Sequence, residues 1–142
     1  MIVDLNNFTD IQIGKKAKNL FLLQKNGFNV PPLFCVLSKP DVSDEALIFE
    51  YIKKHFGKET LFAVRSSSNL EDLDNASFAG QFSTFLNVPF DELFSKIHQC
   101  FNSAEASNVE AYIKETGSAK QAMQMTVIVQ KMVDADVSVV IF

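Results

Sequence analysis

The sequence predicts an α+β domain in which helices flank a mixed or antiparallel sheet. Short apolar, β-prone runs alternate with stretches whose apolar residues recur at helical spacing. The expected order of elements is helix, strand, helix, strand, loop, strand, helix, helix, strand, strand, without regular βαβ repetition. The 142 residues, 47% hydrophobic and 21% charged, suit one ordinary domain or a piece of a larger one.

Capping residues and spacing predict the helices. Residues 14–26 consist largely of helix formers and end at Gly27, a natural C-terminal cap. A second helix stops at Gly57 and begins after one of three N-cap candidates, Asp41, Ser43 or Asp44. Pro89 opens a third, amphipathic helix, and residues 105–116 are a weaker helical candidate.

Five apolar runs predict the strands, and the polar stretch 66–75 is expected to be a loop because it has poor helix and strand character. The last run has no polar tail. Because a complete domain usually ends in a solvated segment, we expect the domain to be incomplete at its C-terminus. The runs lie at 33–37, 61–65, 78–88, 125–133 and 137–142.

Charge and cysteine usage exclude several classes of protein. The net charge of −4 gives no general attraction to nucleic acid or to anionic membranes. The N-terminus lacks the features of a signal peptide, and no apolar run approaches the ~18 residues of a membrane span. Cys35 and Cys100 have no zinc-ligand spacing and are expected to be free, buried thiols in the cytoplasm. We therefore expect no nucleic-acid partner, no membrane partner and no metal held by these cysteines.

Arginine usage draws attention to one position. The 13 Lys and Arg residues comprise twelve lysines and a single arginine, Arg65. It stands at the predicted end of a strand, directly before Ser66, Ser67 and Ser68. Backbone N–H groups and hydroxyls beyond a strand end can surround an anion, and the arginine fork can bind two phosphate oxygens. A capped turn with a surface arginine is the alternative interpretation.

Three other segments have both a functional and a purely structural interpretation. The small residues of 76–81 suit a loop that lies close to a phosphate, or a hairpin. Lysines at the start of the first helix suit a bound anion, or form a solvated cluster. The strand end at 129–133 could hold a flat adenine ring, or be an ordinary core strand.

Together these segments resemble the N-terminal ATP-binding part of the phosphoenolpyruvate synthase / pyruvate phosphate dikinase family, a module that rifampin phosphotransferase shares. Residues 13–20 (IGKKAKNL) look like its opening GGKxxNL motif, with Lys15 in place of the second glycine. Residues 27–34 (GFNVPPLF) resemble GxxVPPGF. Residues 62–81 are similar to AVRSSxxxEDxxxxSFAGQ, and residues 129–138 to VQxMVxADVSG.

The resemblance implies an ATP-grasp fold, in which ATP lies between two subdomains with its triphosphate under a loop. By position in the motifs, Lys16 and Arg65 are the expected catalytic residues and would bind the phosphates of ATP. Ser66, directly after Arg65, is expected to bind the cofactor as well. The first lobe would span roughly 1–88, and residues 89–142 would begin the adenine side. The triphosphate loop would be Ser77, Phe78, Ala79, Gly80 and Gln81, and the adenine-flanking residues Gln130, Met132 and Val133.

The resemblance also implies a reaction that this chain would share with other domains. In the complete enzymes ATP gives its β-phosphate to a histidine on a swivelling domain, leaving AMP and phosphate. That domain and the phosphoenolpyruvate/pyruvate domain would be partners in cis or on a separate chain, and Mg²⁺ ligands would lie beyond residue 142. A stand-alone nucleotide-binding or regulatory module, and an interaction domain with a decayed site, remain alternatives.

Overall fold

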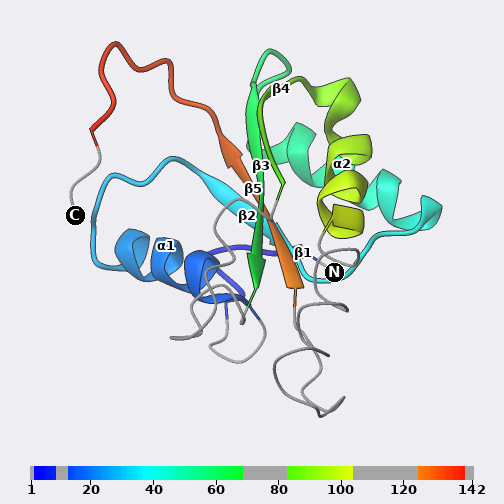
Figure 1. Cartoon of the computed structure of the whole chain (residues 1–142), viewed down its shortest axis with the longest axis horizontal. Coiled ribbons are helices and arrows are strands. Elements are labelled where there is room, and N and C mark those ends of the chain that lie inside the picture. The colour runs from blue at the N-terminus through cyan, green and yellow to red at the C-terminus, as the bar shows by residue number, and fades with distance from the viewer. Residues whose placement is uncertain (1, 9–12, 69–82, 104–124, 140–142) are drawn as a thin grey trace.

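The computed structural model describes residues 2–8, 13–68, 83–103 and 125–139, which form a five-stranded sheet with helices on both faces (Figure 1). The strand order is β1-β2-β5-β3-β4, and all neighbouring pairs are antiparallel. The predicted α+β class is therefore confirmed. The strands are β1 (Ile2–Val3), β2 (Leu33–Val36), β3 (Phe62–Ser68), β4 (Thr84–Val88) and β5 (Met125–Lys131).

The predicted helices of the described part are confirmed, and local signals explain their ends. Helix α1 (Lys15–Lys25) gives way to Gly27, whose φ of 83° suits a residue without a side chain. Helix α2 (Val42–His55) begins with a capping box, in which the Asp41 carboxylate accepts from two backbone N–H groups. Behind Pro89, the turn η1 (Phe90–Glu92) leads into a helix over residues 93–103.

Strand β3 runs further than the sequence predicts. Ser66, Ser67 and Ser68 were expected in a loop, and that prediction is wrong, because all three are paired with β5. The register is continuous from Phe62, opposite Lys131, to Ser68, opposite Met125. A neighbouring strand that offers a partner for each residue outweighs the weak strand propensity of serine.

The C-terminal prediction also needs correction. Residues 137–139 of the expected last strand are not in a strand, and Val137 and Val139 are 78% and 76% exposed. Strand-prone residues form a strand only where a neighbour accepts their backbone hydrogen bonds, so composition alone misled here. Residues 78–82 of the third predicted strand, the helical candidate 105–116 and residues 140–142 lie outside the described residues.

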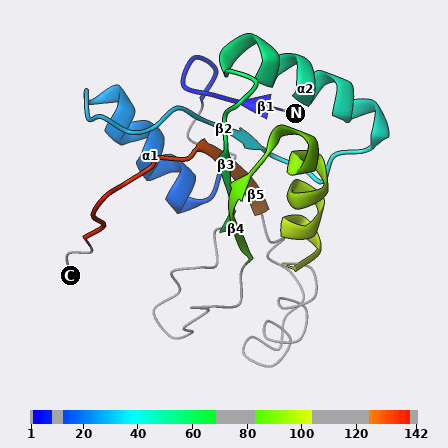
Figure 2. The same cartoon turned by 90° about the horizontal axis from the view of Figure 1, so that it is seen from above.

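Two apolar cores lie on opposite faces of the sheet. Helix α2 and the 93–103 helix cover one face, where Val64, Val127 and Val129 are buried. Helix α1 covers the other, where Ala17 and Phe21 pack with Ile128 of β5. Figures 1 and 2 show α1 on one side of the sheet and the other two helices on the opposite side. Cys35 and Cys100 are both buried, as predicted.

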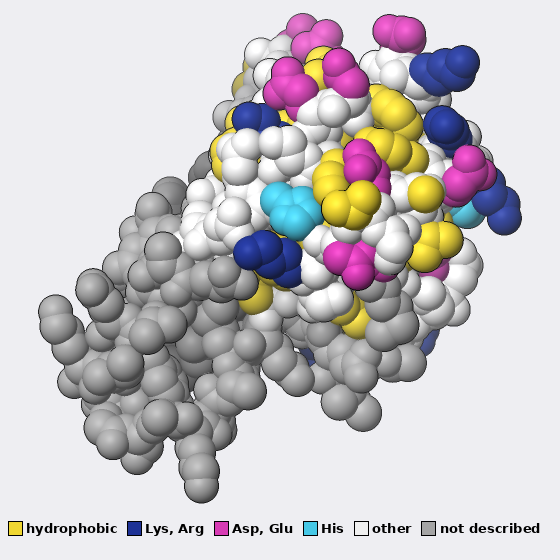
Figure 3. Space-filling view, turned by 90° about the vertical axis from the view of Figure 1, so that its right-hand side faces the viewer, with side chains coloured by type: hydrophobic (Ala, Val, Ile, Leu, Met, Phe, Trp, Pro, Cys, Tyr) yellow, Lys and Arg dark blue, Asp and Glu magenta, His cyan; other side chains and the backbone are white. Residues whose placement is uncertain are grey.

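The surface bears charges of both signs. Figure 3 shows Asp and Glu, Lys and Arg, His and hydrophobic side chains interspersed on one face of the described part. Among the residues that the structure describes, we find no helix with the length and hydropathy needed to cross a bilayer.

Candidate functional site

The register of β3 and β5 determines which side chains share the sheet face on which α1 packs. Arg65 pairs with Ile128, and Ser67 pairs with Thr126. Residues that face each other across a ladder point to the same side, and Ile128 packs under α1. Arg65, Ser67, Thr126 and Gln130 therefore lie on this side of the sheet, which we call the α1 face.

The first turn of α1 is docked on the end of β3. The Ala17 backbone N–H donates to Ser67 Oγ at 3.2 Å. The Lys16 amine donates to the backbone carbonyl of Ser66, with Nζ and O 3.4 Å apart. Lys16, which lies far from Arg65 in the sequence, is thereby brought to the residue that follows Arg65 on β3.

Gly14 makes this docking possible. It is the N-cap residue of α1, and a Cβ built on it would lie 2.6 Å from the carbonyl carbon of Ser67 and 2.7 Å from its oxygen. These are backbone atoms of a paired strand, which cannot move aside as a flexible side chain could. Any side chain at position 14 would push α1 away from β3.

Arg65 lies in the middle of the α1 face. It is half-buried, between Thr84 of β4 and Ile128 of β5. Over residues 2–8, 13–68, 83–103 and 125–139, its guanidinium has no hydrogen-bond or ion-pair partner. A half-buried arginine of this kind offers its planar fork to an anion that approaches the face.

Ser66 contributes differently from what the motif suggests. Its neighbour across the ladder is Val127, which belongs to the core under α2. The buried side chain of Ser66 therefore points away from the α1 face. What it offers to the site is its backbone carbonyl, which accepts from the Lys16 amine. The five candidates Ser77, Phe78, Ala79, Gly80 and Gln81 lie outside the described residues.

The predicted adenine-side residues follow along β5. Gln130 lies diagonally across from Arg65 on the α1 face, and its side-chain amide donates to the Pro31 carbonyl at 3.2 Å. The Met132 N–H donates to the Leu61 carbonyl at 2.9 Å, while Val133 is 56% exposed. Met132 is four residues beyond Ile128, or about 13 Å along the strand direction.

A pocket of about 800 Å³ lies at this end of the sheet. Met132 and Val133 line it beyond the end of β5, together with the segment 57–61 that leads into β3. It lies at the end of the β3–β5 ladder opposite Ser67. The remaining lining residues are Asn87, Lys131, Asp134, Ala135 and Ser138.

Sequence reasoning missed Gly14 and Thr126 as residues near the strand end of the site, and it considered Ser67 only as one of three serines beside an anion. Thr126 is 1% exposed, and its Oγ1 has no hydrogen-bond partner among the residues that the structure describes. Nothing local in the sequence marks it, because only the register with β3 places it beside Ser67. Gly14 and Ser67 stand in conspicuous motifs, but their mutual contact appears only in three dimensions.

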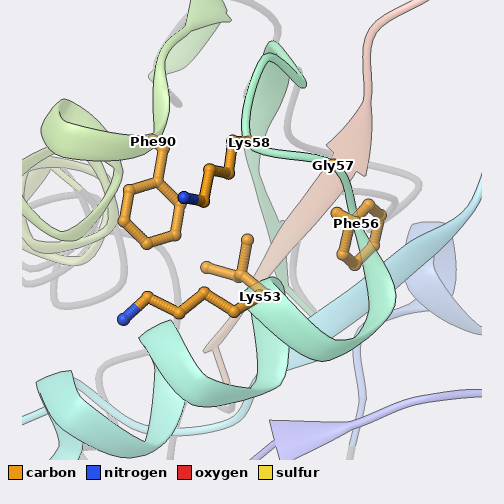
Figure 4. A pocket seen from close by; sticks show the side chains of 6 residues that line it. Lys53, Phe56, Gly57, Lys58 and Phe90 are labelled. Carbon is orange, nitrogen blue, oxygen red and sulfur yellow. The ribbon is translucent and has the colours of Figure 1, made fainter.

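A smaller pocket, of about 150 Å³, adjoins the larger one, with which it shares the lining residues Gly57 and Lys58. Figure 4 shows the Phe90 ring facing the end of α2, with the side chains of Lys53 and Lys58 at the same space. Ile52, Phe56 and Gly57 complete its lining. The pocket belongs to the α2 side and is separated by the sheet from Lys16 and Arg65.

Comparison with known proteins gives a consistent result. Residues 40–142 match the family described as pyruvate phosphate dikinase, AMP/ATP-binding domain. A probable phosphoenolpyruvate synthase of Pyrococcus abyssi is 32% identical over 145 residues, covering 99% of this chain and 17% of that protein. A probable phosphoenolpyruvate synthase of Archaeoglobus fulgidus is 42% identical over 87 residues, covering 61% of this chain and 12% of its own length.

A protein with another printed activity is also similar. The rifampicin phosphotransferase of Bacillus subtilis is 33% identical over 110 residues, covering 75% of this chain and 13% of that enzyme. The chain thus spans less than a fifth of the length of each of these three relatives.

Proposed function

The chain belongs to the family of the pyruvate phosphate dikinase AMP/ATP-binding domain, and from this premise we propose that it is the ATP-binding portion of a phosphoenolpyruvate synthase-like phosphotransferase. The observation that carries the proposal is that α1 brings the Lys16 amine to the carbonyl of Ser66, the residue next to Arg65 on β3. The ATP-grasp fold, the division into lobes near residue 88 and a cytoplasmic location are parts of the same proposal.

The α1 face would bind the triphosphate by charge and by hydrogen bonds. The Arg65 fork can contact two phosphate oxygens at once, and the Lys16 amine adds a second positive charge. The first turn of α1 contains no acidic residue, so the partial positive charge of the helix N-terminus is not neutralised by its own side chains. The loop of Ser77, Phe78, Ala79, Gly80 and Gln81 would cover the phosphates.

The base would lie at the far end of the face. An extended nucleotide with its phosphates at Arg65 would reach the end of β5, where Met132 and Val133 line the larger pocket. Exposed apolar side chains such as Val133 suit the faces of an adenine ring, and backbone groups at the end of a strand suit its edge. Gln130 would help by holding β2 and β5 together through its contact with Pro31.

The described residues fit a triphosphate better than its metal ion. Within the described ranges there is no group of three or more His, Cys, Asp or Glu side chains that could hold a metal. The α1 face contributes cations, so the Mg²⁺ that accompanies ATP would take its protein ligands from outside these residues. Mg²⁺ would supply charge neutralisation of the phosphates, while this chain positions them.

The acceptor of the phosphoryl group would lie elsewhere in the complete enzyme. We propose that a phosphohistidine domain and a phosphoenolpyruvate or pyruvate domain act with this chain, in cis or as a separate chain. The length of the relatives, of which this chain covers at most 17% in the three compared, leaves room for such domains.

Calorimetric titration of the chain with MgATP tests the binding proposal. We expect saturable binding that Lys16→Met weakens, because the variant removes one phosphate-facing charge. Lys54→Met is the matched control, since Lys54 is exposed on α2, on the other side of the sheet. Absence of saturable binding, or equal affinity of the Lys16→Met variant and the wild type, would contradict the proposal.

A further inference from the structure

We propose that Ser67 is a positioning residue: its hydroxyl docks the first turn of α1 on β3 and thereby places Lys16 for the phosphates of ATP. This inference rests on the proposed function, because it concerns the same binding face. It replaces the direct anion contact that the position of Ser67 after Arg65 suggested with a role that acts through Lys16.

Helix α1 lacks an N-cap side chain of its own. The first N–H groups of a helix have no partner within the helix, and a Ser, Thr, Asp or Asn at the N-cap usually supplies one. Here the N-cap residue is Gly14, which has no side chain to supply this acceptor. Ser67 supplies the missing acceptor from a distant strand, because its Oγ receives the N–H of Ala17, the third residue of the helix.

Close packing makes this cap specific. Ser67 is fully buried, and Gly14 sits directly against its backbone, where a Cβ would lie 2.6 Å from the carbonyl carbon. The absence of a side chain at 14 is thus what lets the helix reach the Ser67 hydroxyl. Gly14 and Ser67 form one seat, with one residue from each element.

Contacts with β3 position Lys16 both through the neighbouring backbone and through its side chain. The residue after it, Ala17, is fixed through its N–H by Ser67, while its own amine contacts the carbonyl of Ser66. A buried hydroxyl already engaged with α1 is poorly placed to bind a nucleotide itself. Ser67 therefore influences ATP through the position of Lys16.

A double-mutant cycle separates this role from general stabilisation. The four proteins are the wild type, Ser67→Ala, Lys16→Met and the double variant, each titrated with MgATP by calorimetry. We expect Ser67→Ala to weaken binding about fivefold, the size typical of a lost cap. In the Lys16→Met background the same change should have no further effect, because the group that Ser67 positions is gone.

Two additional proteins complete the design. Ser95→Ala is the control, since the Ser95 hydroxyl also accepts a hydrogen bond, from the Gln99 side-chain amide at 3.1 Å, but lies on the 93–103 helix. It should bind ATP like the wild type. Should Ser67→Ala fail to fold, Ser67→Cys keeps nearly the same volume with a weaker acceptor, and the same loss is expected.

The outcomes distinguish the two proposals. No saturable binding by the wild type would overturn the proposed function and this inference together. Binding by the wild type that Ser67→Ala leaves unchanged would overturn the inference alone. An equal loss in the wild-type and Lys16→Met backgrounds would also overturn it, because it would show that Ser67 acts independently of Lys16.

Discussion

Arg65 is the one arginine among 13 Lys and Arg residues, and it occupies a half-buried position in the middle of the α1 face. Its importance could be predicted from the sequence, because the motif around it is long and lysine is the usual cation of this chain. Its neighbours could not. Ile128 and Gln130 reach it only through the pairing of β3 with β5, across a large separation in sequence.

Replacing Arg65 by lysine keeps the charge and removes the planar fork. We expect Arg65→Lys to weaken MgATP binding by about 1–3 kcal/mol, the contribution of hydrogen bonds to a charged group. Calorimetric titration measures the difference. Lys54→Arg, the reverse exchange on the opposite side of the sheet, should leave the affinity unchanged. An Arg65→Lys variant with wild-type affinity would mean that no bidentate contact is made.

Asp4 and Tyr51 form a polar contact whose strength depends on pH. The Tyr51 hydroxyl donates to Asp4 Oδ2 at 2.7 Å. Partial burial alone would raise the pKa of Asp4, but hydrogen bonds from Tyr51 and from the backbone of Asn6 and Asn7 outweigh it, so the pKa lies below its ordinary value. Burial and the Asp4 contact raise the pKa of Tyr51.

A lowered carboxylate pKa stabilises the fold only while the group is ionised. The contribution of Asp4 is complete above the pKa of unfolded Asp, about 3.9, and is lost as the pH falls through the lower pKa of the folded state. We expect Tyr51→Phe to lower the melting temperature at neutral pH, with a difference from the wild type that shrinks in acid. Thermal unfolding followed between about pH 7 and pH 3 checks this, and a constant difference would contradict it.

At the scale of elements, local signals predicted what local interactions determine. The Asp41 capping box and Gly27 end or begin helices through contacts within a few residues, and both were visible in the sequence. Whether a partner strand is present explains two differences from the prediction: β3 extends through Ser68, and the strand predicted at 137–139 does not form. That information lies in the tertiary fold and not in composition.

The two glycines at the ends of α1 allow a matched comparison. Gly27 has a φ of 83° with open space around it, so Gly27→Ala should cost about 1–2 kcal/mol of stability through backbone strain. It should leave ATP affinity unchanged, because the C-terminal end of α1 lies away from Lys16.

Gly14→Ala should have both effects. The added Cβ would meet the backbone of Ser67, displace the first turn of α1, and so lower both stability and ATP affinity. Urea unfolding and MgATP titration of both variants provide the measurements. A Gly14→Ala protein that unfolds and binds like Gly27→Ala would show that the seat on β3 does not matter for the nucleotide.

At the scale of the whole molecule, the two faces of the sheet differ in what they can do. The face under α2 and the 93–103 helix is closed by an apolar core. On the α1 face, the apolar core lies over β2 and Ile128, while Arg65 and Gln130 occupy polar positions beside it. The motifs predicted which residues would form a site, and the antiparallel register explains why these polar residues share one face.

We expect the isolated chain to bind MgATP without turning it over. Phosphoryl transfer needs an acceptor and metal ligands, which we propose lie elsewhere in a longer enzyme, and this chain covers 17% of the Pyrococcus relative. An assay for AMP during incubation with MgATP tests this expectation. Steady AMP production by the 142-residue chain would show that the complete catalytic machinery lies within it.

The most direct test of the central claim is an NMR titration of the ¹⁵N-labelled chain with MgATP. If the α1 face binds the nucleotide, saturable shifts will occur at the backbone N–H groups of Lys16, Ala17 and Arg65 and around Met132, while those of Ile52 and Phe90, which line the smaller pocket and not the larger one, stay unchanged. Shifts centred on Ile52 and Phe90, or none that saturate, would contradict the assignment of ATP to the α1 face.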